Sequence, residues 1–198
     1  EEMARLAVDT GFRTVLLSGL SNFNFSLEEM RDCYQKYNAF HPLVSYQLGF
    51  HAEYTTSKEL MEGIAKISEE FKAPVYTHNS ETRIEVEGCL ERYGMTPTAL
   101  MDALGMLNYG GGGYHCVYLS DEDMDIFKKR GMTVVTNPGS NMKLASGVPR
   151  TAELLKWQLV RMVRRAITAW ICSEKCFWLP DLPNSEKRMR AWFPRKKY

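Results

Sequence analysis

The sequence of 198 residues has no long hydrophobic run. A membrane-crossing helix needs about 20 consecutive apolar residues, and no segment of this chain approaches that length. The first residues also lack the succession of basic, apolar and small residues that forms a secretory signal. We therefore expect a cytoplasmic protein that has no membrane as a partner.

Cysteine is scarce and scattered along the chain. Five cysteines stand at positions 33, 89, 116, 172 and 176, and their odd number and uneven spacing argue against a disulfide framework. The last two lie close together but have no second pair to complete a structural zinc site. With 44% hydrophobic and 25% charged residues, the composition is typical of one globular domain with a real core.

A net charge of +1 conceals a strong asymmetry. Residues 1–149 contain 13 Lys or Arg against 20 Asp or Glu, whereas residues 150–198 contain 12 against 4. All four tryptophans, at positions 157, 170, 178 and 192, lie in the basic part. So abrupt a change in composition marks a boundary. We predict a folded segment at 1–155 and an irregular basic tail at 156–198.

Before residue 155, short apolar runs alternate with capped amphipathic segments, a pattern typical of strand–helix units around a parallel sheet. Strands are expected at 14–17, 43–48, 75–77, 114–119 and 133–136. Helices are expected at 2–8 and 81–92 and after the capping residues Ser26, Thr56, Thr96 and Ser120. The glycines at 110–113 lack the following Lys and Ser or Thr of a phosphate-binding loop, so a flexible turn is expected there.

The segment HNSET, residues 78–82, follows the apolar run 73–77. It places His78 and Glu81 three residues apart at the carboxyl end of an expected strand, where barrel enzymes hold a metal and a proton carrier. Neutral imidazole is a natural ligand of a divalent metal. Taken alone, the pair also fits a core histidine beside a helix-capping glutamate.

Three further segments accompany HNSET in a fixed order: GFHAEYTTS at 49–57, YHCVYLSDED at 114–123 and NPGSNMKLASG at 137–147. Together the four resemble the amidohydrolase superfamily, most closely its methylthioadenosine/S-adenosylhomocysteine deaminase branch. The resemblance covers residues 1–155 and implies an α/β fold, an incomplete TIM-type barrel with about five of the eight strand–helix units. Since the chain opens inside a helical pattern at Glu1, we expect an upstream portion to be missing.

The resemblance also implies roles for four residues. His78 would be a metal ligand, and Glu81 would bind the substrate and move a proton to its ring nitrogen. His115 would face the attacking water, and His51 would contact the substrate. Zinc is the expected metal, with iron or manganese as alternatives. The expected substrate is a small nucleoside, 5′-methylthioadenosine or S-adenosylhomocysteine, and guanine, cytosine or triazine hydrolysis is the alternative.

Two departures and one loop qualify this picture. Glu53 stands where the family usually has proline, and Ser18 lies in a segment where these deaminases usually carry arginine, which leaves the substrate open. The loop at 137–141 is expected to be structural, because asparagine side chains can pin backbone turns.

The family's metal site also needs a His-x-His pair from the first strand and an aspartate from the eighth. The sequence contains no His-x-His, and it lacks the Gly-Thr-Asp-Gly segment that would carry the aspartate. A shift of reading frame near Lys156 would explain the tail, because residues 160–170 can be encoded so that another frame spells TDGAASNNCL, as the family continues. We therefore expect negligible turnover from this chain. Two non-catalytic alternatives are a tail that binds nucleic acid or an acidic partner, which we rank low, and a fragment that associates with a complementary half. A homo-oligomer is left open.

Overall fold

The computed structural model describes residues 1–155. The predictions of an irregular, frame-shifted or nucleic-acid-binding tail fall on residues 156–198 and lie outside the described residues. No helix within residues 1–155 combines the length and the apolar character needed to cross a membrane.

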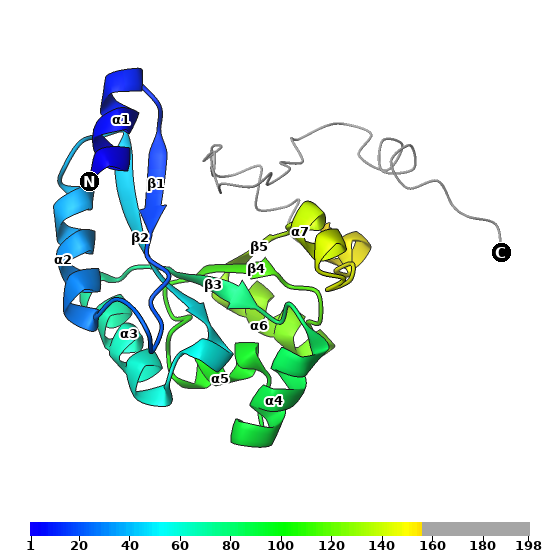
Figure 1. Cartoon of the computed structure of the whole chain (residues 1–198). Helices are drawn as coiled ribbons and strands as arrows, with labels where there is room; N and C mark the ends of the chain where they lie inside the picture. Colours follow the sequence, from blue (N-terminus) through cyan, green and yellow to red (C-terminus); the bar gives the residue numbers. More distant parts are fainter. Residues whose placement is uncertain (156–198) are drawn as a thin grey trace.

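The described chain forms one parallel sheet whose strands follow one another in sequence order. The strands are β1 (Thr14–Leu17), β2 (Val44–Ala52), β3 (Val75–Asn79), β4 (Gly111–His115) and β5 (Met132–Val135). Each strand pairs with the next, so β1 and β5 are the outer strands of an open sheet in the described part. The predicted α/β fold with five units of an unclosed barrel is confirmed (Figure 1).

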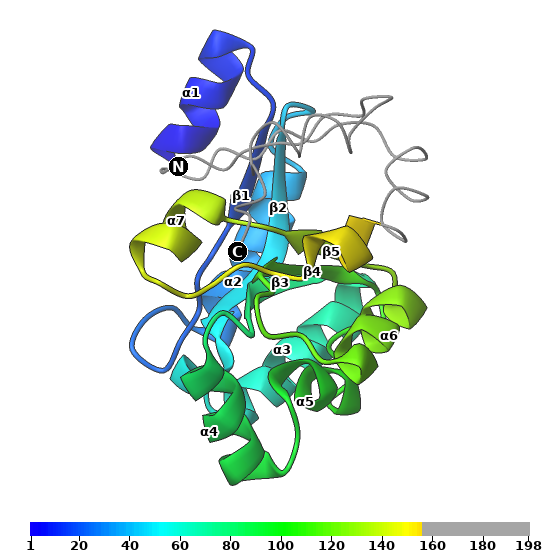
Figure 2. The ribbon, with the colours of Figure 1, turned by 90° about the vertical axis from the view of Figure 1, so that its right-hand side faces the viewer.

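Helices connect the strands, as the alternating pattern predicted. They are α1 (Glu2–Thr10), α2 (Leu27–Asn38), α3 (Lys58–Phe71), α4 (Arg83–Tyr93), α5 (Pro97–Ala103), α6 (Asp121–Arg130) and the short α7 (Pro138–Lys143), with a 3-10 turn at Glu53–Thr55. Figure 2 shows α3, α5 and α6 together on one face of the sheet, with α7 on the other side.

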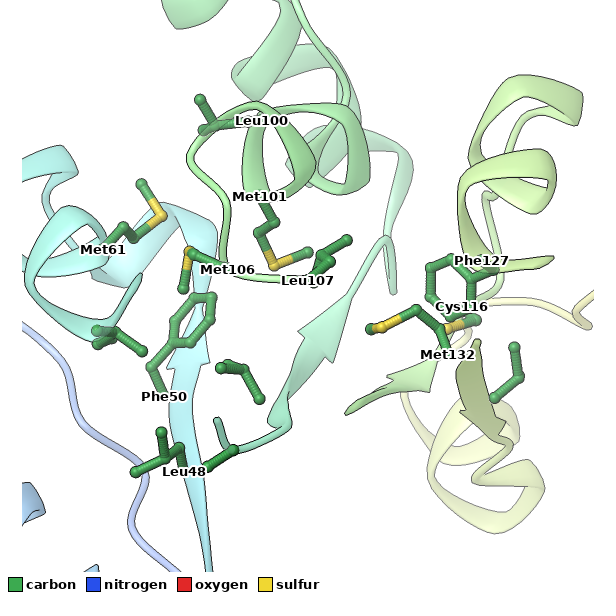
Figure 3. Close-up of a cluster of buried hydrophobic side chains, with 14 of the residues drawn as sticks. Leu48, Phe50, Met61, Leu100, Met101, Met106, Leu107, Cys116, Phe127 and Met132 are labelled. Carbon is green, nitrogen blue, oxygen red and sulfur yellow. The ribbon is translucent and has the colours of Figure 1, made fainter. Parts of the chain in front are cut away.

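A hydrophobic core joins helices α2 to α6 to the sheet, and a second, smaller cluster packs α1 against α2 and β2. In Figure 3, Leu48 and Phe50 of β2 meet Met61 of α3 and Met106 near α5, all four fully buried. Phe127 of α6 packs farther along the sheet in the same cluster. Each large apolar side chain contributes about 1.5–3 kcal/mol when fully buried. The core therefore anchors the strands and leaves their carboxyl ends to carry polar side chains.

Helix capping agrees with the sequence prediction at most positions. Ser26 and Ser120 each form a capping box, with Glu29 and Asp123 as the reciprocal partners. The cap of α3 is the exception, because Ser57 rather than Thr56 accepts the Leu60 backbone N–H, and Thr56 is buried instead. The prediction there was wrong by one residue.

The flexible turn predicted at 110–113 is also wrong, because Gly111–His115 forms β4. The missing side chains allow close packing: a Cβ on Gly111 would lie 1.8 Å from the Val75 carbonyl oxygen, and one on Gly113 would lie 2.6 Å from the Cys116 sulfur. Glycine in a strand is typical of such close approach. The strand ends early because His115 and Cys116 turn into the left-handed region, with φ of 68° and 51°.

Candidate active site

Three histidines from neighbouring strands meet at the carboxyl edge of the sheet. His51 lies near the end of β2, His78 in β3 and His115 at the end of β4. The centroid of the His78 ring is 5.2 Å from the centroid of His51 on one side and 5.2 Å from that of His115 on the other. The parallel register, which pairs Ala52 with His78 and Asn79 with His115, brings them together.

His78 is held in its neutral form. Burial, then the neighbouring charges of His115 and His51, lower the pKa of His78 from its ordinary value of 6.5 to about 4. Its Nδ1 atom is buried and has no hydrogen-bond partner within the described part of the chain. A neutral imidazole is the form that a metal ion binds, so His78 has the protonation state that a ligand requires.

Glu81 and His115 lie side by side in the same site. The carboxylate Oε1 of Glu81 is 3.5 Å from Nδ1 of His115, and both side chains are largely buried, with 14% and 6% exposed. The Ser146 hydroxyl donates a hydrogen bond of 3.0 Å to the same carboxylate oxygen. Segments that follow β3, β4 and β5 therefore converge on one acidic group.

Asn141 orients the ring of His115. The amide oxygen of Asn141, which only accepts, lies 2.6 Å from Nδ1 of His115, so Nδ1 is the donor of this hydrogen bond. Asn141 is itself buried on α7. Sequence reasoning gave this loop a structural role, and the structure places one of its side chains in direct contact with the site.

His51 is held by the turn that follows its own strand. Its Nδ1 lies 2.9 Å from the Thr55 hydroxyl, and the ring meets Tyr54 edge to face with 6.1 Å between centroids. Glu53 in this turn is buried and forms an ion pair of 2.6 Å with Arg92 of α4. Glu53 therefore ties the turn that follows His51 to α4, the helix that follows the His78 strand.

Backbone strain concentrates beside the histidines. Ser80, His115 and Cys116 adopt left-handed conformations without being glycine, at a cost of the order of 1–3 kcal/mol each. The two loops brace one another, because the Cys116 N–H donates to the Asn79 carbonyl and the Tyr118 N–H donates to the Ser80 carbonyl. Strained backbone that is held in this way is common where side chains must point into a site.

Glu85 is a site residue that sequence reasoning missed. Its carboxylate accepts the backbone N–H groups of Ser80 and Glu81, each at 2.8 Å. The signal for it was present, since Thr82 and Glu85 have the Ser/Thr-x-x-Glu spacing of a helix start. Ser146 carried no such signal, because it reaches Glu81 across 65 residues of sequence.

The described residues do not by themselves complete a metal site. Within residues 1–155, no group of three or more His, Cys, Asp and Glu side chains is arranged so that it could hold a metal ion. A catalytic zinc normally takes three protein ligands, and His78 has the protonation state that one such ligand requires.

Comparison with known proteins identifies relatives of this chain. The 5-methylthioadenosine/S-adenosylhomocysteine deaminase of Caldicellulosiruptor saccharolyticus is 36% identical over 154 residues, which are 77% of this chain and 36% of that protein. The 5′-deoxyadenosine deaminase of Methanopyrus kandleri is 32% identical over 162 residues, 79% of this chain and 38% of that protein. The chain thus spans less than two-fifths of the length of these relatives.

Solved structures agree with the fold. An adenosine deaminase from Xanthomonas campestris with bound zinc superposes with a TM-score of 0.72 and 26% identity, over 78% of this chain and 37% of that one. A guanine deaminase from C. acetobutylicum, with guanine in its active site, gives 0.72 with 21% identity over 78% and 40%. The second likeness supports the fold alone. The model of the amidohydrolase family matches residues 2–161, so the chain belongs to that family.

Proposed function

We propose that residues 1–155 form the central section of a hydrolytic deaminase site that acts on an adenine-type nucleoside. One observation carries the proposal: a neutral His78 stands between His51 and His115, with the carboxylate of Glu81 beside His115. Relatives that cover this segment are deaminases of 5-methylthioadenosine, S-adenosylhomocysteine or 5′-deoxyadenosine, which favours a nucleoside over a free base as substrate.

Each side chain has a task that its surroundings support. Glu81 carries a proton between water and a ring nitrogen, and the Ser146 hydroxyl keeps its carboxylate oriented. His115, whose Nδ1 donates to Asn141, leaves its other ring nitrogen, Nε2, for the reacting groups. His51 contacts the substrate from the adjacent strand.

The metal of this family would find one ligand in His78. Bound there with further ligands, a divalent ion would lower the pKa of water and so supply a nucleophile. Zinc is the ion present in the Xanthomonas campestris structure, and iron or manganese are alternatives for this chain. The remaining ligands are not provided by residues 1–155. We therefore expect the 198-residue chain to release no measurable ammonia from these nucleosides, even with added zinc.

A chimera tests the proposed site directly. Residues 2–155 would replace the corresponding segment of the Caldicellulosiruptor saccharolyticus relative, so that the missing barrel units and ligands are supplied. Ammonia release from 5′-methylthioadenosine, S-adenosylhomocysteine and guanine would then be measured. We expect turnover of the nucleosides, and a loss of about 10²–10⁴-fold in kcat for Glu81→Gln. Glu87→Gln, an exposed change on α4, the helix that follows Glu81, is the matched control and should be neutral.

The outcomes separate the alternatives. Turnover that survives Glu81→Gln in a folded, zinc-loaded chimera would refute the assignment of the proton carrier. Preference for guanine would favour the base-deaminase alternative. Ammonia release by the unmodified 198-residue chain, provided that Glu81→Gln abolishes it, would support the function and refute the proposed inactivity of the fragment.

The boundary near Lys156 has its own test. We propose that the encoding DNA changes frame there, so that its codons spell the motif TDGAASNN one base out of phase. Sequencing the gene with its flanks decides this, and in-phase codons without that motif would end the proposal. Salt-dependent binding of single-stranded DNA that disappears on deletion of residues 157–198 would instead support a binding tail.

A further inference from the structure

Glu85 accepts hydrogen bonds from the backbone of Ser80 and Glu81, and Glu81 is the acid of the site. Glu85 lies on α4, three residues after the N-cap Thr82, whose hydroxyl accepts the Glu85 N–H at 3.2 Å. The Glu85 side chain turns back past the cap. One carboxylate oxygen accepts the Ser80 N–H and the other accepts the Glu81 N–H, both at 2.8 Å. An ordinary capping box reaches the N-cap residue, whereas this carboxylate reaches farther toward the strand.

These hydrogen bonds act on a strained part of the backbone. Ser80 is fully buried and left-handed, with φ of 50°, in the position directly before Glu81. Two charge-assisted bonds from a single rigid acceptor fix both peptide units that flank this strained turn. If the bonds were lost, the strained turn at Ser80 would rest on the bonds that the Asn79 and Ser80 carbonyls accept from Cys116 and Tyr118, and the Glu81 side chain would be held less firmly beside His115.

We propose that Glu85 is the positioning residue of this site, which sets the direction of the Glu81 side chain by clamping the Ser80–Glu81 backbone. The proposal rests on the proposed function only in naming Glu81 as the proton carrier. The clamp itself is a property of the fold.

The charge state of Glu85 gives the clamp a spectroscopic signature. Burial raises the pKa of Glu85 to about 6, although the backbone N–H groups of Glu81, Ser80 and Thr82 lower it, and the Glu81 carboxylate adds to the rise. The other titratable neighbours are Tyr54, Cys89 and Cys116, whose pKa values are raised above their ordinary range, first by burial and then in part by Glu85. They stay neutral near pH 6, so they do not obscure the titration of Glu85.

Amide spectroscopy on the full 198-residue chain tests the clamp without any need for turnover. In the wild type, the amide shifts of residues 80 and 81 should move together with a midpoint near pH 6. In Glu85→Gln that movement should vanish, and hydrogen exchange at both amides should quicken by about tenfold or more. Amides 75–77 of β3 should stay protected. Glu87→Gln should behave as the wild type does.

Two results would overturn the proposal: amides 80 and 81 that do not titrate together in the wild type, or amides that Glu85→Gln leaves unchanged. If Glu85→Gln fails to fold, the wild-type titration alone decides. In the active chimera, Glu85→Gln should lower kcat and leave KM nearly unchanged, because substrate contacts remain. A chimera that is inactive although amides 80 and 81 are coupled to Glu85 would refute the proposed function and leave the clamp standing.

Discussion

The pKa values of two groups of the site, the half-buried His78 and the buried Glu85, are shifted in opposite directions, which gives the stability of this chain a distinctive response to acid. The native pKa of His78 is lowered from 6.5 to about 4, and that of Glu85 is raised from 4.5 to about 6. His78 therefore contributes stability that is complete above pH 6.5 and is lost as the pH falls toward 4. Glu85 contributes stability that is complete below pH 4.5 and is lost as the pH rises through 6.

The magnitudes follow from the size of the two displacements. At about 1.4 kcal/mol per pKa unit, acidification from pH 7 to pH 5 lowers the unfolding free energy by about 2 kcal/mol through His78. Over the same interval Glu85 raises it by about 1 kcal/mol, so the two effects partly cancel. Removing either group should therefore reveal the pH dependence that the other contributes to stability.

Urea unfolding at pH 7 and pH 5, in the presence of a chelator so that no metal occupies His78, measures these differences. Relative to the wild type, the unfolding free energy of Glu85→Gln should fall by about 1 kcal/mol more on acidification, and that of His78→Gln by about 2 kcal/mol less. Glu87→Gln again serves as the control, since it is exposed on the same helix. An equal pH dependence of the unfolding free energy in the wild type and the three variants would refute the conclusion that burial disfavours the charged forms of His78 and Glu85.

Two further substitutions test the scaffold around the site. Arg92→Met leaves the buried Glu53 carboxylate without its ion-pair partner, and urea unfolding should show a loss of about 2–4 kcal/mol that Glu53→Gln largely restores in the double variant. Gly111→Ala forces a Cβ to within 1.8 Å of the Val75 carbonyl oxygen at φ of 134°, so its melting temperature should fall sharply. Gly139→Ala, where nothing lies within 4 Å, should leave the melting temperature unchanged or slightly raised. Equal effects at the two glycines would contradict the close packing of β4.

Local signals in the sequence predicted most of the fold. The strand expected at 14–17 is β1, and the capping spacing of Ser26 and Ser120 located the starts of α2 and α6. The failure at β4 has a physical cause. Strand propensity favoured the aromatic and β-branched residues after position 113, whereas β4 begins with the glycines at 111–113, which allow close pairing with β3. No local pattern in the sequence reveals how closely two strands approach.

The site residues also fall into two groups, those that the local sequence predicts and those that depend on tertiary contacts. His78 and Glu81 were readable because a polar pair directly follows an apolar run. The contact between Asn141 and His115 joins segments 26 residues apart, and the one between Ser146 and Glu81 joins segments 65 apart, so each depends on tertiary packing that spacing does not encode. Which residues carry out chemistry remains a prediction until the chimera is assayed.

The arrangement of the sheet explains why a site-like cluster forms in so small a part of the barrel. Because β2, β3 and β4 are consecutive and parallel, each connecting helix returns the chain to the same edge, and His51, His78 and His115 meet through neighbouring strands alone. Glu81 is fixed by Glu85, only four residues away. The groups to which we assign proton handling thus lie within residues 1–155, whereas three metal ligands are not found among the same residues. Geometry around Glu81 and catalytic competence are therefore separable, and a chain that keeps the first without the second should show coupled amides at 80 and 81 together with no release of ammonia.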